Sequence, residues 1–235
     1  WFMEFAEAYR KNTSLPYACF GMAKNIDAEV AAALKKSNCK CVEFGIEAGN
    51  EKIRKEVYKK NISDDDIKRA AAILHAQHIK FLTFNMVGAP FETTEHMAET
   101  IRLNQEIKTD YPWCSIMQPY PGTEIFNYCV ENGLIASSAE INSFTYFENS
   151  ILNQPVKKNI ENVHRLFFLF AKVPLLNRAY NTIINLPLTP LYTLIFYACY
   201  TYSLKKRYSV TLRHLVRYWF KVQATKRLLG NRENS

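Results

Sequence analysis

Apolar and polar residues alternate in blocks along the first 135 residues, and these blocks predict strands and helices in turn. Short apolar runs bounded by turn residues indicate strands, whereas apolar residues spaced three and four positions apart indicate helices. Strands are predicted at 17–21, 41–47, 80–87 and 113–117. Helices are predicted at 1–10, 28–36, and after the capping residues Ser63, Thr94 and Thr123. The helical crossovers are long enough for parallel strand pairing, so the pattern indicates an α/β fold.

The repeated strand–helix unit suits part of a barrel better than a small open sheet, although periodicity does not separate the two. In a barrel, the carboxyl ends of the strands share one rim, where ligands bind. Glycine and polar residues follow three of the predicted strands, at 45–50, 88–93 and 118–123. Glu47 at such a strand end could bind a ligand, or it could cap the following helix. The coincidence of the three segments predicts a binding site at the rim.

The pattern changes after residue 139, which suggests a division of the chain into three parts. We expect an α/β part at 1–139, incomplete at its N-terminus because Trp1 already lies in a predicted helix. An irregular connector is expected at 140–158, and a basic, apolar, mostly helical region at 159–235, beginning with a helix at 159–170. The N-terminus shows no basic-then-apolar leader, so a cytoplasmic location is expected.

The C-terminal region carries most of the positive charge. The net charge is −4 over residues 1–156 and +12 over residues 157–235. No charged residue occurs at 179–204, a stretch long enough to cross a bilayer but interrupted by asparagine and proline. Burial against a protein domain, interfacial membrane contact and a membrane span all remain open for it.

A basic, amphipathic helix is predicted at 211–229. It could lie on an anionic membrane surface or pack through its apolar stripe. Peripheral membrane contact through 183–229 is therefore possible, and the protein could be membrane-associated. No nucleic-acid partner is expected, because the aromatic residues of this helix lie on its apolar face rather than among the arginines.

The six cysteines form no CxxC motif and no paired framework. In a reducing cytosol they would serve as small core residues. Cys39 and Cys41 point to the same face of a predicted strand, but two thiols without further ligands do not make a metal site.

Three segments at the predicted strand ends resemble a known family when they are taken together. These are Gly45-Ile-Glu-Ala-Gly-Asn50 with the later Lys59, then Gly88-Ala-Pro-Phe-Glu-Thr93, then Pro119-Tyr-Pro-Gly-Thr123. They are similar to the GIESGN, GxPGET and PYPGT motifs of radical S-adenosylmethionine (SAM) enzymes, in particular the branch with an N-terminal cobalamin-binding domain. The resemblance covers about residues 1–135 and implies the later part of a partial (β/α)6 TIM-like barrel.

The resemblance implies an enzyme that cleaves SAM reductively at a [4Fe–4S] cluster, and the cobalamin branch implies cobalamin bound by a preceding domain. The implied reaction is methyl transfer or another radical rearrangement on a lipid, a secondary metabolite or another small molecule. A reductant such as flavodoxin or ferredoxin is implied as a partner. SAM has a ribose diol that seeks hydrogen-bond acceptors and a carboxylate that seeks a cation. The SAM-contacting positions implied by the motifs are Glu47, Lys59, Gln118, Tyr120 and Gly122.

Each implied contact has a plainer alternative. Lys59 could be a solvated lysine at a helix end. Gly88 and Pro90 are expected to shape a turn, while Glu92 and Thr93 are expected to begin the next helix.

The sequence also departs from the family. Ala48 replaces the usual serine of GIESGN, and Phe91 replaces the usual glycine of GxPGET. The CxxxCxxC loop that holds the cluster does not occur here, and we expect it to precede Trp1. The alternative hypothesis is a non-catalytic SAM-binding or membrane-surface module without the cluster.

Overall fold

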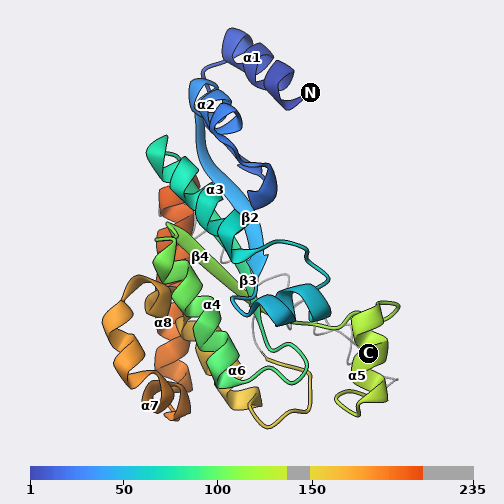
Figure 1. The fold of residues 1–235 in the computed structure, drawn as a ribbon. Helices are drawn as coiled ribbons and strands as arrows, with labels where there is room; N and C mark the ends of the chain where they lie inside the picture. Colours follow the sequence, from blue (N-terminus) through green and yellow to red (C-terminus); the bar gives the residue numbers. More distant parts are fainter. Residues whose placement is uncertain (137–148, 209–235) are drawn as a thin grey trace, which may run out of the picture. The chain divides into compact units, whose positions relative to one another are not determined.

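The structure is a computed structural model that describes residues 1–136 and 149–208 (Figure 1). The chain divides into two compact units, Trp1–Ile195 and Phe196–Ser235. All the predicted site residues lie in the first unit, and the following description concerns that unit unless stated otherwise.

Four parallel strands form the sheet, in the order β1-β2-β3-β4. They are β1 (Tyr17–Phe20), β2 (Cys39–Glu47), β3 (Lys80–Val87) and β4 (Tyr111–Ile116). The order follows the chain because each crossover returns to the neighbouring position, as right-handed βαβ units do. The α/β fold predicted from the sequence is confirmed, and the carboxyl ends of the strands lie at one edge of the sheet.

Helices alternate with these strands. They are α1 (Phe2–Asn12), α2 (Ala28–Lys36), α3 (Asp64–Ala76), α4 (Thr94–Glu106) and α5 (Glu124–Glu131), with short turns η1 (Ala23–Asn25) and η2 (Ile53–Val57). Of these, α2, α3, α4 and α5 begin at side-chain caps. Asp27, Ser63 and Thr123 accept the predicted capping hydrogen bonds. The cap of α4 is Thr93 rather than Thr94, because the Thr93 hydroxyl accepts from the amide of His96.

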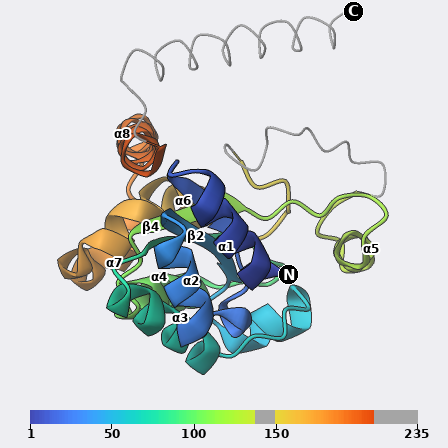
Figure 2. The same cartoon turned by 90° about the horizontal axis from the view of Figure 1, so that it is seen from above.

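The main core lies between the sheet and the helices α2, α3 and α4 (Figure 2). Val42, Phe44 and Ile46 alternate along β2 and face this layer, as expected for one face of a strand. Burying a large apolar side chain contributes about 1.5–3 kcal/mol, so each buried residue of this layer stabilises the unit. The opposite face of the sheet carries a smaller cluster of strand residues around Cys41, Leu82 and Tyr111.

The segment after the connector is helical, with α6 (Lys157–Lys172), η4 (Pro174–Ala179), α7 (Tyr180–Asn185) and α8 (Thr189–Tyr208). The helix predicted at 159–170 is confirmed as α6, which packs against β4 and α4. Tyr180, Ile184 and Tyr192 are buried in the same apolar cluster as α6. The first part of the uncharged stretch therefore packs against the α/β unit.

Within the described part of the chain, no helix is both long and apolar enough to cross a bilayer. The uncharged stretch 179–204 is divided among η4, α7 and α8, with a break at residues 186–188. The helix predicted at 211–229 and residues 140–148 of the predicted connector lie outside the described residues.

Candidate functional site

Strand β2 ends in a tight backbone turn at Glu47. Its φ is +68°, and the amide of Ala48 donates to the carbonyl of Ile46 over 3.0 Å, which closes a three-residue turn. The pairing register with β3 shifts between Gly45 and Glu47. A positive φ is costly for a residue with a Cβ and persists only where the surroundings hold it. This turn directs the Glu47 side chain back over the end of its own strand.

The Glu47 carboxylate pairs with Lys60 above Gly45. Lys60 Nζ lies 2.5 Å from Glu47 Oε1, and the two side chains are 30% and 19% exposed. A Cβ added at Gly45 would lie 2.1 Å from Glu47 Oε1 and 2.4 Å from Lys60 Nζ. The pair therefore occupies the space that any side chain at residue 45 would fill, and it remains partly accessible to a ligand.

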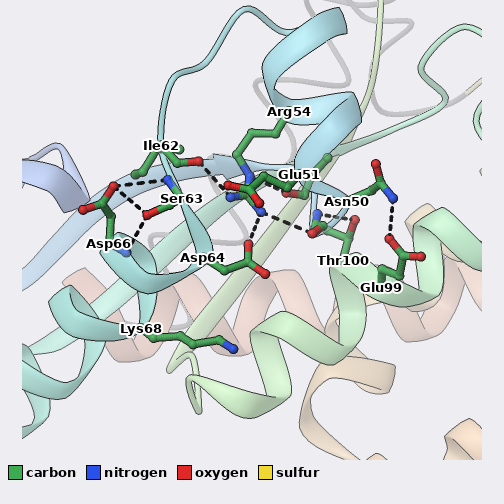
Figure 3. Close-up of polar contacts among 12 residues, drawn as sticks. Asn50, Glu51, Arg54, Ile62, Ser63, Asp64, Asp66, Lys68, Glu99 and Thr100 are labelled. Carbon is green, nitrogen blue, oxygen red and sulfur yellow. Dashed lines mark hydrogen bonds and ion pairs between the residues drawn. The ribbon is translucent and has the colours of Figure 1, made fainter.

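Arg54 is buried beneath the loop that follows Glu47 (Figure 3). Its guanidinium donates to the carbonyls of Ala48, Gly49 and Ile62 at 2.9, 3.2 and 2.9 Å. It also donates to Asp64 Oδ1 at 2.5 Å, which supplies its counter-charge. A buried charge is tolerated when it is paired and hydrogen-bonded in this way.

Gly49 and Asn50 connect the same loop to α4 (Figure 3). The amide of Gly49 donates to Thr100 Oγ1 at 2.8 Å, and Asn50 Nδ2 donates to Glu99 Oε2 at 2.7 Å. Asn50 Oδ1 also accepts from the amide of Ile53 at 3.0 Å, so Asn50 stabilises the start of the helical segment that leads into η2. The loop after β2 is thus held from two sides.

The turn after β3 encloses a buried carboxylate. Glu92 Oε2 accepts from the amides of Gly88 and Ala89, and among the described residues Oε1 has no hydrogen-bond partner. Burial raises the pKa of Glu92 to about 7. Gln154 accepts from the amide of Phe91 and so fastens the turn. Glu92 therefore closes the turn from within, whereas the sequence suggested that it begins α4.

The segment after β4 contains three of the predicted site residues. Gln118 is buried, donates from Nε2 to the carbonyl of Asn149 at 3.1 Å, and leaves Oε1 without a partner among the described residues. Tyr120 is 47% exposed, and its carbonyl accepts from the Thr123 hydroxyl at 2.6 Å. Gly122 has a φ of +85°, with no atom within 4 Å of a Cβ placed there. Its role in the structure is to form the turn before α5.

Lys59 lies apart from Glu47. It lines a cleft of about 770 Å³ between the end of η2 and α5, together with Glu56, Glu124, Asn127, Tyr128 and neighbouring residues. The neighbouring Lys60 makes the ion pair with Glu47. A contact between Lys59 and SAM stays a prediction, as do the contacts of Glu47, Gln118, Tyr120 and Gly122.

Sequence reasoning did not identify Lys60 or Arg54 as site residues. Two adjacent lysines follow η2, and which of them faces Glu47 depends on the helical turn before them. That turn is a π-helix, with the amide of Tyr58 bonded to the carbonyl of Ile53 at 3.2 Å. The wider turn shifts the following residues, and no pattern of apolar residues signals it. An arginine among polar residues gives no signal of burial either.

The residues at this edge fit SAM but not an iron–sulfur cluster. A carboxylate, an ammonium group and a buried amide oxygen match the diol, the carboxylate and the adenine amino group of SAM. Among the described residues, no group of three or more His, Cys, Asp or Glu side chains could hold a metal ion. None of the six cysteines forms a disulfide, and they show no cluster spacing. We therefore derive no step through a cluster from these residues.

Comparisons with known proteins show which family and fold this chain is similar to. Residues 4–103 match the Radical SAM superfamily. An "Uncharacterized methyltransferase PH0819" of Pyrococcus horikoshii is 29% identical over 130 residues, covering 54% of this chain and 27% of that protein. The chain thus spans about a quarter of the length of this relative.

A solved structure shares the fold. It is the radical S-adenosylmethionine methyltransferase TsrM from Kitasatospora setae, with cobalamin and a [4Fe–4S] cluster bound. It superimposes with a TM-score of 0.50 and 15% identity over 59% of this chain and 28% of that one. The matched segment, the methyltransferase relative and the shared fold lead to one conclusion: residues 4–103 of this chain are similar to the radical SAM superfamily.

Proposed function

We propose that this chain supplies the SAM-binding edge of a cobalamin-dependent radical SAM methyltransferase. The observation that carries the proposal is the Glu47–Lys60 pair above Gly45, a carboxylate and an ammonium group held side by side at the end of β2. Support for methyl transfer comes from the methyltransferase relative, and support for cobalamin comes from the structural neighbour that holds it.

Each residue has a defined task in the proposed complex. The Glu47 carboxylate accepts hydrogen bonds from the ribose hydroxyls, and Lys60 meets the methionine carboxylate. Gln118 Oε1, buried and without a partner in the described residues, accepts from the adenine amino group. When bound to a [4Fe–4S] cluster, SAM supplies one-electron cleavage chemistry. The cluster ligands are not found in this sequence, so the tasks of these residues are binding and orientation.

Titration of the chain with SAM tests this function. We expect Glu47→Gln and Lys60→Met each to weaken SAM binding at least tenfold, since a charge-assisted hydrogen bond contributes about 1.5–3 kcal/mol. Isothermal titration calorimetry gives the dissociation constants, and S-adenosylhomocysteine serves as a stable second ligand.

Lys59→Met removes the same charge from the adjacent residue, so it compares the contact predicted for Lys59 from the sequence with the assignment to Lys60. It should change the affinity less than twofold. A larger loss of SAM affinity in Lys59→Met than in Lys60→Met would indicate that Lys59 is the cation that binds the methionine carboxylate. Unchanged binding in Glu47→Gln would contradict the proposed site.

The substrate and partners follow from the same proposal. We propose a lipid or secondary-metabolite substrate, electron delivery from reduced flavodoxin or ferredoxin, and peripheral membrane contact within 183–229. The apolar side chains of Leu188, Leu191 and Leu194 are exposed, which favours a surface contact for this part. Flotation of the chain with anionic vesicles, against neutral vesicles as control, tests the membrane contact.

A second candidate is a non-catalytic SAM-binding module. It is favoured by the absence of the cluster-binding cysteine motif from this sequence. Iron analysis of the natural gene product, isolated without oxygen, separates the two candidates. About four iron atoms per chain would support the enzyme, and an iron-free product that still binds SAM would support the module.

A further inference from the structure

Arg54 lies between the two residues of the Glu47–Lys60 pair in the chain and contacts the backbone next to both. It is fully buried, with 0% of its side chain exposed, although it carries a charge. Its only counter-charge in the described residues is Asp64, which is 40% exposed. Such a group is costly to bury, and its hydrogen bonds indicate what it stabilises.

The side chain of Arg54 holds the backbone that follows Glu47. Nε donates to the carbonyl of Ala48 at 2.9 Å, and Nη2 donates to the carbonyl of Gly49 at 3.2 Å. Ala48 is also the residue whose amide closes the turn at Glu47. Because a positive φ at Glu47 is unfavourable without support, these bonds stabilise the turn that directs the carboxylate.

The backbone of Arg54 holds the other residue of the pair. Its carbonyl accepts from the amide of Lys60 at 2.9 Å, beyond the end of the π-helical turn. Its guanidinium donates to the carbonyl of Ile62 at 2.9 Å and to Asp64, which fixes the chain on the far side of Lys60 (Figure 3). Arg54 thus contacts the backbone at or next to both Glu47 and Lys60.

We propose that Arg54 is a positioning residue that holds Glu47 and Lys60 together at the distance SAM requires. This inference rests on the proposed function for its ligand, but the positioning of the pair can be measured without SAM. The task calls for arginine, because its planar guanidinium presents several donors in fixed directions, whereas a lysine ammonium cannot reach four acceptors spread around it.

Competitive labelling of the lysines measures the pairing directly. The chain is treated with a limiting amount of an amine-reactive ester, cleaved after glutamate, and analysed by tandem mass spectrometry. Lys59 is exposed and serves as the internal reference for Lys60 in the same peptide. In the wild-type chain we expect Lys60 to react at least threefold more slowly than Lys59.

Arg54→Lys should bring the reaction rate of Lys60 to within a factor of 1.5 of that of Lys59 and should raise the SAM dissociation constant at least tenfold. Asp64→Asn is the milder variant if Arg54→Lys fails to fold, and it should shift both values in the same direction by a smaller factor. Arg69→Lys is the matched control, because Arg69 pairs with Asp66 on the exposed side of α3. It should change neither value.

The outcomes separate this inference from the proposed function. An unchanged labelling ratio in folded Arg54→Lys would overturn the positioning role. A changed ratio with unchanged SAM affinity would overturn the link to the ligand. A changed ratio in a chain that binds no SAM even as wild type would leave the positioning role standing and refute the proposed function instead. A merely structural role would lower the melting temperature without selectively changing the ratio of these two adjacent lysines.

Discussion

Gly45 leaves room for the Glu47–Lys60 pair because it has no side chain. The distances of 2.1 and 2.4 Å from a Cβ at this residue to Glu47 and Lys60 are shorter than any real contact of this kind. Both neighbouring atoms are the far ends of flexible side chains, so the side chains can move aside while the sheet stays intact. A methyl group here should therefore disturb the ion pair more than the fold.

Gly45→Ala should accordingly weaken SAM binding at least tenfold and lower the unfolding free energy by no more than about 1–2 kcal/mol, within the range for overpacking. Calorimetric titration and chemical denaturation measure the two quantities. Gly133→Ala is a useful comparison, because it lies in a turn with a φ of +67° and has no atom within 4 Å of an added Cβ. Gly133→Ala should lower the unfolding free energy without changing SAM affinity. A loss of SAM affinity in Gly133→Ala but not in Gly45→Ala would argue against a site at the end of β2.

For individual residues, the sequence pointed to a carboxylate and a lysine near the rim, but it did not indicate which lysine pairs with Glu47. Glu47 was predicted because a polar residue between glycines ended an apolar run. Lys59 was predicted as a SAM contact from a resemblance in spacing, and that contact stays a prediction, while the lysine that pairs with Glu47 is Lys60. Side-chain direction after a π-helical turn depends on backbone geometry that local composition does not encode.

At the scale of elements, the loop after β2 packs closely against helix α4. A Cβ added at Gly49 would lie 2.5 Å from the backbone of Glu99 and Thr100. Backbone atoms within a helix cannot turn aside as side-chain ends can. The loop reaches this distance to form the bond from the Gly49 amide to Thr100 Oγ1.

Gly49→Ala should therefore cost about 1–3 kcal/mol of unfolding free energy, as overpacking of a well-fitted contact does. Thermal and urea unfolding, compared with Gly122→Ala, provide the measurement. Gly122 has open space around it, so its variant carries only the cost of a positive φ. Equal losses of unfolding free energy in the two variants would show that α4 shifts to accommodate the added methyl group.

The elements themselves were largely predictable, for physical reasons that differ among them. The α2 helix at 28–36 and the β3 strand at 80–87 have the predicted bounds, because a side-chain cap or a sharp change in polarity marks their ends. Strand β4 begins at Tyr111, two residues before the predicted start, where Pro112 obscured the pattern. The packing of α6 on β4 and the contacts of the loops were not predicted.

At the scale of the whole molecule, two buried groups give opposite contributions to the pH dependence of stability. Burial raises the pKa of Glu92 from 4.5 to about 7 and lowers the pKa of His164 from 6.5 to about 3. Between pH 4.5 and 6.5 the folded chain holds an extra proton on Glu92, while the unfolded chain holds one on His164. Stability changes with pH according to this difference in bound protons, so the two groups offset each other in that window.

The contribution of Glu92 should therefore emerge when wild type and Glu92→Gln are compared. Between pH 4.5 and about 7, the wild type should lose stability relative to the variant as pH rises, by about 1 kcal/mol per pH unit. Above about pH 8 the difference should become constant. Urea denaturation at half-unit pH intervals measures it, with Glu95→Gln as the exposed control. A difference that does not vary with pH would show that Glu92 has the same pKa in the folded and the unfolded chain.

The connections around Arg54 have a consequence for protein engineering. The residues that present the Glu47 carboxylate are spread over the segment from Gly45 to Asp64, and Thr100 and Glu99 on α4 complete their support. A graft of the Gly45–Asn50 segment alone into another barrel would carry the carboxylate without the restraints that aim it. Transplanting this binding edge would require the whole strand, its π-helical turn and the facing side of α4 as a single module.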